Sequence, residues 1–171
     1  MSRDAEVRIV AAREEDVPII LALIRALAEY EKLLHECVAT EADLHRWLFG
    51  PRPAAKTVLA FVGETPVGFA LFFENFSTFL GRPGIYLEDL FVREEWRGRG
   101  IGRRLLEHLA ALAVEQGFGR LEWAVLDWNA PSIAFYRSLG ARLLDEWKIF
   151  RLTGDALTSL GRRAMTPVDR V

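Results

Sequence analysis

Residues 97–102 alternate arginine with glycine and read Arg-Gly-Arg-Gly-Ile-Gly, and Arg103 and Arg104 follow directly. The preceding residues 85–92 are mostly apolar and rich in β-forming types, which predicts a buried strand. The following residues 103–116 carry apolar side chains at the spacing of one helix face. A glycine turn between a strand and a helix leaves the first N–H groups of the helix free to bind an anion, which would also attract the arginines. The chemistry expected here is the binding of a phosphate or a diphosphate.

The same residues are also consistent with a tight turn beside a solvated basic surface. Two known phosphate motifs are excluded. A P-loop ends in Gly-Lys-Ser/Thr, whereas Gly102 is followed by two arginines. The dinucleotide fingerprint needs two residues between its second and third glycine, and only Ile101 separates Gly100 from Gly102.

Two carboxylates, Glu88 and Asp89, interrupt the predicted buried strand. A buried carboxylate is costly unless it has a partner or a chemical role. Taken alone, each is equally typical of a partner for a nearby arginine or turn and of a proton acceptor. Regular alternation would send the two side chains to opposite faces of the sheet, and a β-bulge would change this assignment.

The pattern Arg97-x-x-Gly100-x-Gly102 between a strand and a helix resembles the pyrophosphate-binding signature of the GNAT superfamily of acyl-CoA-dependent N-acetyltransferases. Residues 76–92 and 128–136 resemble more narrowly the branch of spermidine/spermine (diamine) and thialysine acetyltransferases. The resemblance covers about residues 7–160 and implies one N-acetyltransferase domain over residues 1–171. The expected fold is α/β (α+β): a central mixed, mostly antiparallel sheet with a parallel pair at the splayed cofactor site, flanked by helices.

The resemblance implies acetyl-CoA as co-substrate, no metal ion, and transfer of an acetyl group to the primary amine of a small cationic molecule, a polyamine or a thialysine-like amino acid. The extended pantetheine arm of acetyl-CoA would pair with the edge of the strand near residues 90–92. The predicted cofactor-binding residues are Leu90, Phe91, Val92, Arg97, Gly98, Arg99, Gly100, Ile101, Gly102, Arg103, Asn129, Pro131, Ser132 and Tyr136.

An alkylamine with a pKa near ~10.4 is protonated at neutral pH, so a base must remove its proton before it can attack. The predicted base is Glu88, acting through water as the family implies, and the N–H of Leu90 is the predicted donor to the oxyanion. The predicted acid for the departing thiolate is Tyr136, a phenol with a pKa near ~10. Without the family match, Tyr136 is more typical of a half-buried core aromatic.

The predicted substrate-binding residues combine the family positions with the negative charge that suits a cationic amine. They are Tyr30, Glu31, Glu88, Glu122, Trp123, Ala124 and Glu146. Whether Asp145 or Glu146 faces the substrate stays open. The acceptor could instead be a protein lysine or N-terminus, and a non-catalytic acyl-CoA-binding module or a nucleotide-binding protein remain alternatives.

Periodicity and turn chemistry predict the remaining elements. Helices are expected at residues 14–32, from a capping-box-like start at Thr40 to near 49, from an N-cap at Asn129 to Gly140, and at 155–160. Strands are expected at residues 7–11, 57–62, 67–76, 121–126 and 142–152, with a loop at 76–84. The order strand, helix, strand over residues 85–126 predicts a right-handed crossover and hence a parallel pair.

The chain has 171 residues, a formal net charge of −2 and a pI near 6.0, which argues against non-specific nucleic-acid binding. Cys37 is the only cysteine, so neither an internal disulfide nor a thiolate metal site is expected. No apolar run reaches ~20 residues and no signal-peptide pattern is present, which predicts a cytoplasmic protein without a membrane partner. Trp47 and Phe79 are predicted to be exposed and to contribute to a homodimer.

Overall fold

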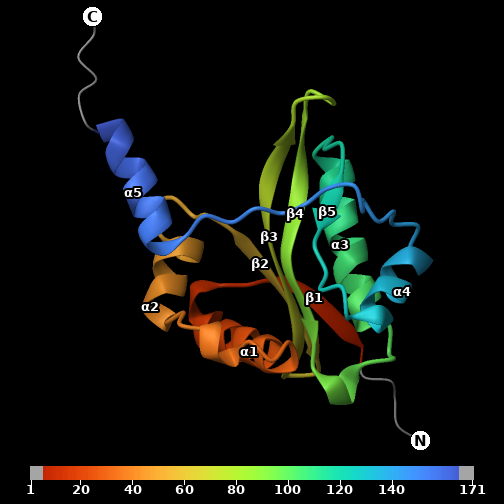
Figure 1. Cartoon of the computed structure of the whole chain (residues 1–171). Coiled ribbons are helices and arrows are strands. Elements are labelled where there is room, and N and C mark those ends of the chain that lie inside the picture. The colour runs from red at the N-terminus through yellow and green to blue at the C-terminus, as the bar shows by residue number, and fades with distance from the viewer. Residues whose placement is uncertain (1–5, 166–171) are drawn as a thin grey trace, which may run out of the picture. The chain divides into compact units, whose positions relative to one another are not determined.

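The chain divides into two compact units, of which the first ends at Ala124 and the second begins at Val125. The first unit contains a five-stranded mixed sheet (Figure 1). The structure is a computed structural model and describes residues 6–165. The strands lie in the order β1 (Val7–Ala11), β2 (Lys56–Val62), β3 (Thr65–Ser77), β4 (Arg82–Val92) and β5 (Leu121–Trp123). Neighbours from β1 to β4 are antiparallel, and β4 and β5 are parallel. This confirms the predicted sheet and its parallel pair.

Helices cover both faces of this sheet. The first unit contains α1 (Val17–Tyr30), α2 (Glu41–Leu44) and α3 (Ile101–Glu115), with short helical turns at Glu14–Asp16, Leu34–Glu36, His45–Phe49 and Glu94–Trp96. The apolar stripe of α1 packs with Leu59, Phe69 and Phe91 of the sheet. On the other face, α3 buries Leu105 and Leu109 completely. Burial of these stripes, more than helix propensity, fixes both helices on the sheet.

The N-terminus of α2 is capped as predicted. The Thr40 hydroxyl accepts a hydrogen bond from the Asp43 N–H at 3.2 Å, and an Asp43 carboxylate oxygen accepts one from the Thr40 N–H at 3.0 Å. These reciprocal bonds satisfy backbone donors that a helix start leaves unpaired.

Two predicted boundaries were wrong in the first unit. The ladder between β3 and β4 continues to the pair Ser77 and Arg82, so the predicted loop at 76–84 shrinks to the turn between them. Pro83 is tolerated in β4 because the pairing with β5 starts only at Ile85, so its missing N–H costs no bond to β5. The last strand is also shorter than predicted, since β5 ends at Trp123.

The second unit contains α4 (Ala130–Ser138) and α5 (Gly154–Met165). The strands predicted at 142–152 are wrong, because residues 141–153 form no strand. Trp147 donates its backbone N–H to Leu144 O within a local turn, and the side chains of Ile149 and Phe150 are exposed. Alternating apolar residues form a strand only where a neighbouring strand and a buried face receive them, and this segment has neither in the described structure. None of the helices within residues 6–165 is long and apolar enough to cross a bilayer.

Candidate active site

A glycine turn joins β4 to α3, as the sequence predicted. Gly98 and Gly100 have φ angles of +74° and +75°, in the left-handed region that favours glycine. A Cβ at either position would meet no atom within 4 Å, so conformation and not lack of space requires the glycine. The first hydrogen bond of α3 runs from the Arg104 N–H to Gly100 O at 3.0 Å, so the amides of residues 101–103 precede the helical ladder. The loop therefore presents N–H groups where an anion can bind.

Arg97 links this loop to the end of α1. Its Nε donates a hydrogen bond to Val92 O at 2.9 Å. Its guanidinium lies 4.3 Å from the ring centre of Tyr30 and 5.6 Å from that of Phe91. Arg99 instead stacks on Trp96 at 4.6 Å. The positive charge held beside open amides fits a diphosphate, while the contact of Arg97 with Tyr30 places the predicted cofactor and substrate residues side by side.

Strand β4 has an open edge next to this loop. Its pairing with β5 covers only Ile85 to Leu87, whereas its pairing with β3 continues to Val92. Between residue 88 and Val92, β4 therefore has a strand neighbour on one side only within the described chain. Such an edge presents N–H and C=O groups to an extended ligand. The Val92 carbonyl is already used by Arg97. The Arg93 N–H donates to Val67 O of β3, so by alternation the backbone groups of Phe91 face β3, and those of Leu90 face the open edge and are available for pairing.

A β-bulge in β4 brings Glu88 and Asp89 to the same side of the sheet. Leu71 pairs with Asp89 and the next residue, Phe72, pairs with Leu87, so Glu88 is the extra residue. Beyond the bulge, Asp89 and Phe91 are two residues apart and therefore point to the same face of the sheet. Phe91 packs in the core that α1 forms on this face. Of the two alternatives that the sequence left open, regular alternation and a β-bulge, the structure therefore has the bulge, and Asp89 lies on the same face as Glu88.

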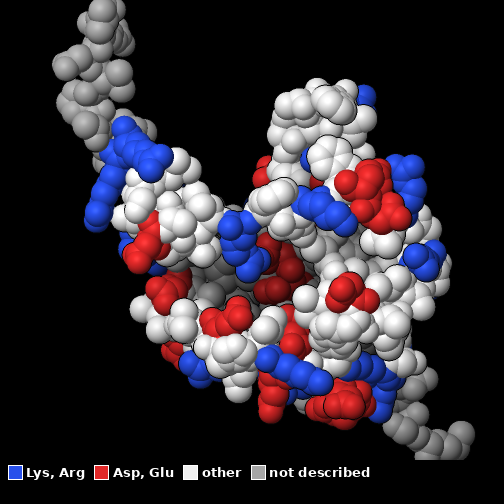
Figure 2. Space-filling view, viewed as in Figure 1, with Lys and Arg blue, Asp and Glu red and all other residues white. Residues whose placement is uncertain are grey.

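Carboxylates from two elements meet at this bulge. Burial and then the charges of Glu88 and Glu31 raise the pKa of Asp89 to about 6. Burial also raises the pKa of Glu31, the residue that follows α1. In Figure 2, viewed as in Figure 1, acidic side chains (red) lie over the middle of β4. The structure thus brings together the carboxylates of Glu31, Glu88 and Asp89. Asp89 holds a proton more readily than an ordinary aspartate.

Glu122 lies on the same face, one strand away. It pairs with Tyr86 across β4 and β5. Burial and then the charges of Glu88 and Glu122 raise the pKa of Tyr86, so both carboxylates face this tyrosine. The ring of Phe73 stacks on Tyr86 with the ring centres 5.2 Å apart. We call Glu31, Glu88, Asp89 and Glu122 together the acidic wall, and the substrate-binding role of Glu122 stays a prediction.

The carboxylate of Glu122 is held by two side chains. Its Oε2 lies 2.9 Å from Arg120 Nε and accepts a hydrogen bond from Asn75 Nδ2 at 3.0 Å. The Arg120 Nε–H is nevertheless not aimed for a hydrogen bond, and this atom and Asn75 Oδ1 are buried without a hydrogen-bond partner. Arg120 and Glu122 therefore form an ion pair, but the Nε–H of Arg120 makes no hydrogen bond in it.

Trp123 and Ala124 are placed differently from Glu122. Trp123 pairs with Leu87, whose side chain is buried, while Glu122 pairs with Tyr86. Successive side chains on a strand point to opposite faces, so Glu122 and Trp123 do not share one wall. Ala124 is exposed beyond the end of β5.

The predicted residues of the second unit cluster on α4. Asn129 is buried, and its Oδ1 accepts a hydrogen bond from the Ser132 N–H at 3.3 Å, with Pro131 in the first turn. This confirms the predicted N-cap. Tyr136 lies on the same helix, half-buried, with its ring centre 5.4 Å from that of Phe135. Glu146 is exposed in the turn after the helix.

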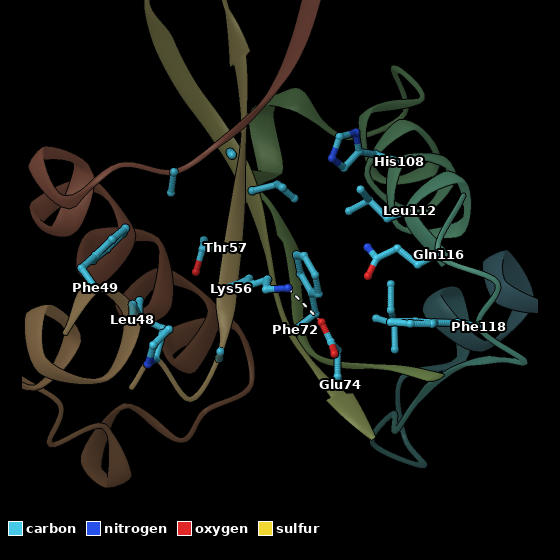
Figure 3. Close-up of a pocket in the computed structure, with 16 residues that line it drawn as sticks. Leu48, Phe49, Lys56, Thr57, Phe72, Glu74, His108, Leu112, Gln116 and Phe118 are labelled. Atoms are coloured by element: carbon cyan, nitrogen blue, oxygen red, sulfur yellow. Dashed lines mark hydrogen bonds and ion pairs between the residues drawn. The ribbon is translucent and has the colours of Figure 1, made fainter. Parts of the chain in front are cut away.

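A cavity of about 480 Å³ lies on the α3 side of the sheet. Figure 3 shows His108, Leu112 and Gln116 of α3 along one side and Leu48 and Phe49 along the other. The Lys56 ammonium, paired to Glu74 at 2.9 Å, lies between the two sides. None of the predicted site residues lines this cavity. Within residues 6–165, no group of three or more His, Cys, Asp or Glu side chains is placed to hold a metal ion.

Comparison with known proteins decides the family. The profile of the acetyltransferase (GNAT) family matches residues 20–141. The chain belongs to the GNAT family of acetyltransferases. Thialysine N-epsilon-acetyltransferase of Bos taurus is 40% identical over 167 residues, covering 91% of this chain and 98% of that protein. L-ornithine N5-acetyltransferase of Arabidopsis thaliana is 36% identical over 200 residues, covering 91% and 88%.

A solved structure has a similar fold. An integron cassette protein from the mobile metagenome of V. cholerae superimposes with a TM-score of 0.78 and 28% identity, covering 91% of this chain and 98% of that one. This GNAT protein is therefore an N-acetyltransferase, and enzymes of its family use acetyl-CoA.

Sequence reasoning missed three residues that lie around Glu122: Tyr86, Asn75 and Arg120. The alternation of Arg120 with Glu122 places both on one face of a strand, which is a signal that the sequence contains. Asn75 is 47 positions from Glu122, and only the pairing of β3 with β4 brings them into contact. No local pattern reports such a contact.

Proposed function

We propose that this acetyltransferase moves the acetyl group of acetyl-CoA to the primary amine of a small cationic molecule, either a diamine or polyamine or an amino acid with a side-chain amine. The observation that carries the proposal is the acidic wall formed by Glu31, Glu88, Asp89 and Glu122 on one face of the first unit. A wall of negative charge attracts a cationic amine and raises its local concentration. Relatives named for thialysine, L-ornithine and spermidine/spermine acetylation support the same substrate class.

Acetyl-CoA supplies the acetyl group as an activated thioester. The amides of residues 98–103, together with Arg97, Arg99 and Arg103, hold the diphosphate in this proposal. The open edge of β4 at Leu90 receives the extended pantetheine arm. Asn129, Pro131 and Ser132 at the start of α4 complete the cofactor contacts that the family resemblance implies.

The proposed chemistry needs a proton acceptor and a proton donor. Glu88 is exposed at the bulge, where a water molecule can reach it, and accepts the proton of the substrate ammonium through that water. Asp89 and Glu31 keep the ammonium at the wall when they are ionised. The Leu90 N–H donates to the oxygen that gains negative charge, and Tyr136 gives its proton to the sulfur that leaves.

A turnover screen tests the proposal. Purified protein is mixed with acetyl-CoA and polyamines, diamines, thialysine, ornithine, lysine, or lysine-containing and N-terminal peptides, and thiol release and the acetylated product are measured. The proposal expects rapid turnover with the small amines and little with the peptides. Selective acetylation of peptides, or acetyl-CoA binding without turnover of any amine, would contradict it.

We also propose that the acetyltransferase forms a homodimer. The Trp47 side chain is half exposed and that of Phe79 almost fully exposed, and large aromatic side chains are enriched at protein interfaces. Sedimentation at several concentrations should give the mass of two chains. A single-chain mass at all concentrations would refute this.

A further inference from the structure

Arg120 and Glu122 form a pair of opposite charges at a fixed distance from the proposed base. Glu122 pairs with Tyr86, which lies two residues along β4 from Glu88. With about 3.3 Å per residue along a strand and about 4.8 Å between neighbouring strands, the backbone positions of Glu88 and Glu122 are roughly 8 Å apart. This spacing is comparable to the distance between the side-chain amine and the α-carbon of an amino acid such as ornithine. A substrate whose amine lies beside Glu88 thus places its far end at Glu122 and Arg120.

The pair is accessible to a ligand and is not saturated by the protein. The side chains of Arg120 and Glu122 are 32% and 31% exposed, so a small molecule can reach both. Only Oε2 of Glu122 is used by Arg120 and Asn75, and within residues 6–165 its Oε1 has no hydrogen bond in the structure. Buried polar atoms in native proteins normally have hydrogen-bond partners, yet Asn75 Oδ1 has none, and Arg120 Nε has only its ion pair with Glu122.

The backbone holds this arrangement in place. Gly84 lies between the two side chains that contact Glu122: a Cβ there would come within 2.7 Å of Arg120 Cγ and 2.8 Å of Asn75 Oδ1. Only glycine lets Arg120 and Asn75 approach so closely at this point. The cluster is therefore built by three strands, with Asn75 on β3, Gly84 on β4 and Glu122 on β5.

We propose that Arg120 and Glu122 determine substrate specificity by binding the α-carboxylate and the α-ammonium of an amino acid that is acetylated on its side-chain amine. The two charges of an amino acid sit on one carbon, and the guanidinium and the carboxylate offer the opposite charges side by side. A diamine of the same length has an ammonium for Glu122 but nothing for Arg120, whose positive charge then repels it. The inference rests on the proposed function, since it concerns the far end of the same substrate.

The test compares substrates that differ only in the carboxylate. Ornithine and putrescine share their carbon chain and side-chain amine, as do lysine and cadaverine. The wild-type kcat/KM for each amino acid should exceed that for its diamine by about tenfold or more, the size of one lost charge-assisted contact. Lysine amide, which keeps the α-ammonium and loses the negative charge, should behave like cadaverine.

Variants then assign the discrimination to the two residues. Arg120→Gln should lower kcat/KM for ornithine, mainly through KM, and leave putrescine unchanged or improved. Arg120→Lys should retain part of the preference, because it keeps the charge and loses the planar fork. Glu122→Gln should weaken both substrates, since both carry an ammonium at this end. Arg52→Gln, which removes an exposed arginine elsewhere, is the matched control and should change neither.

Each result decides the inference separately from the proposed function. If no amine is acetylated, the proposed function fails. If amines are acetylated but putrescine is used as well as ornithine, the inference alone fails. It also fails if ornithine is preferred and Arg120→Gln, with a melting temperature equal to that of wild type, lowers both substrates equally. The first comparison uses the unmodified protein, so instability of a variant cannot hide the outcome.

Discussion

Replacing Asp89 with asparagine should change how the free energy of unfolding depends on pH. Asp89 has a pKa of about 6 in the folded protein, because burial and the charges of Glu88 and Glu31 disfavour its ionised form, and an ordinary value of 3.8 in the unfolded chain. Between these two values the folded state binds more protons than the unfolded state. Stability contributed by this group is therefore present at low pH and is lost as pH rises through about 6.

The two pKa values set the size of the effect. They differ by about two units, and each unit corresponds to about 1.4 kcal/mol, so ionising Asp89 in the folded state costs roughly 3 kcal/mol. An asparagine of similar volume carries no charge, and its amide can donate to the neighbouring carboxylates. Relative to wild type, Asp89→Asn should gain roughly 3 kcal/mol between pH 4 and pH 7.

Urea unfolding of both proteins at several pH values, without ligands, measures this difference. Asp43→Asn provides a control of opposite sign, because hydrogen bonds from Thr40 lower the pKa of Asp43 and its contribution to stability is lost as pH falls. Curves for wild type and Asp89→Asn that stay parallel from pH 4 to pH 7 would refute the account of the buried carboxylate.

Three further predictions concern activity. Tyr136→Phe should lower kcat by at least about tenfold with little change in the Kd for acetyl-CoA, as expected for a proton donor, and unchanged turnover in a thiol-release assay would remove Tyr136 from the mechanism. Gly100→Glu should abolish acetyl-CoA binding in calorimetry. The control Gly63→Glu replaces a similar left-handed glycine in the hairpin between β2 and β3 and should retain binding. Equal affinities of the two variants would mean that the cofactor binds elsewhere. The kcat/KM for a cationic amine should rise as pH increases through about 6, because Asp89 must lose its proton to attract the ammonium. The same rise of kcat/KM near pH 6 in Asp89→Asn would contradict this assignment.

Local chemistry made much of the fold predictable. The glycine turn before α3, the cap at Thr40 and the cap at Asn129 depend on a few neighbouring residues, and each was predicted from its own segment. The parallel pairing of β4 and β5 followed from the handedness of a strand, helix and strand crossover. Such features need no knowledge of distant segments.

The face of Asp89 depended on a distant segment. Its side chain lies on the α1 face because Leu71 pairs with Asp89 and Phe72 with Leu87, which leaves Glu88 as the extra residue of a bulge. The register of β3 against β4 determines this bulge. The strands predicted at 142–152 failed for a related reason, since apolar alternation there meets no neighbouring strand in the described structure. Pairing between distant segments determined both the face of Asp89 and the absence of strands at 142–152. A short window of sequence does not contain this information.

A crystal structure of the protein with coenzyme A tests the central claim most directly. The account predicts that the diphosphate accepts hydrogen bonds from the amides of residues 98–103 and that the pantetheine arm lies along the open edge of β4, with its sulfur directed towards Glu88. A diphosphate bound at another place, for example in the cavity between α3 and the sheet, with the glycine loop free, would contradict it.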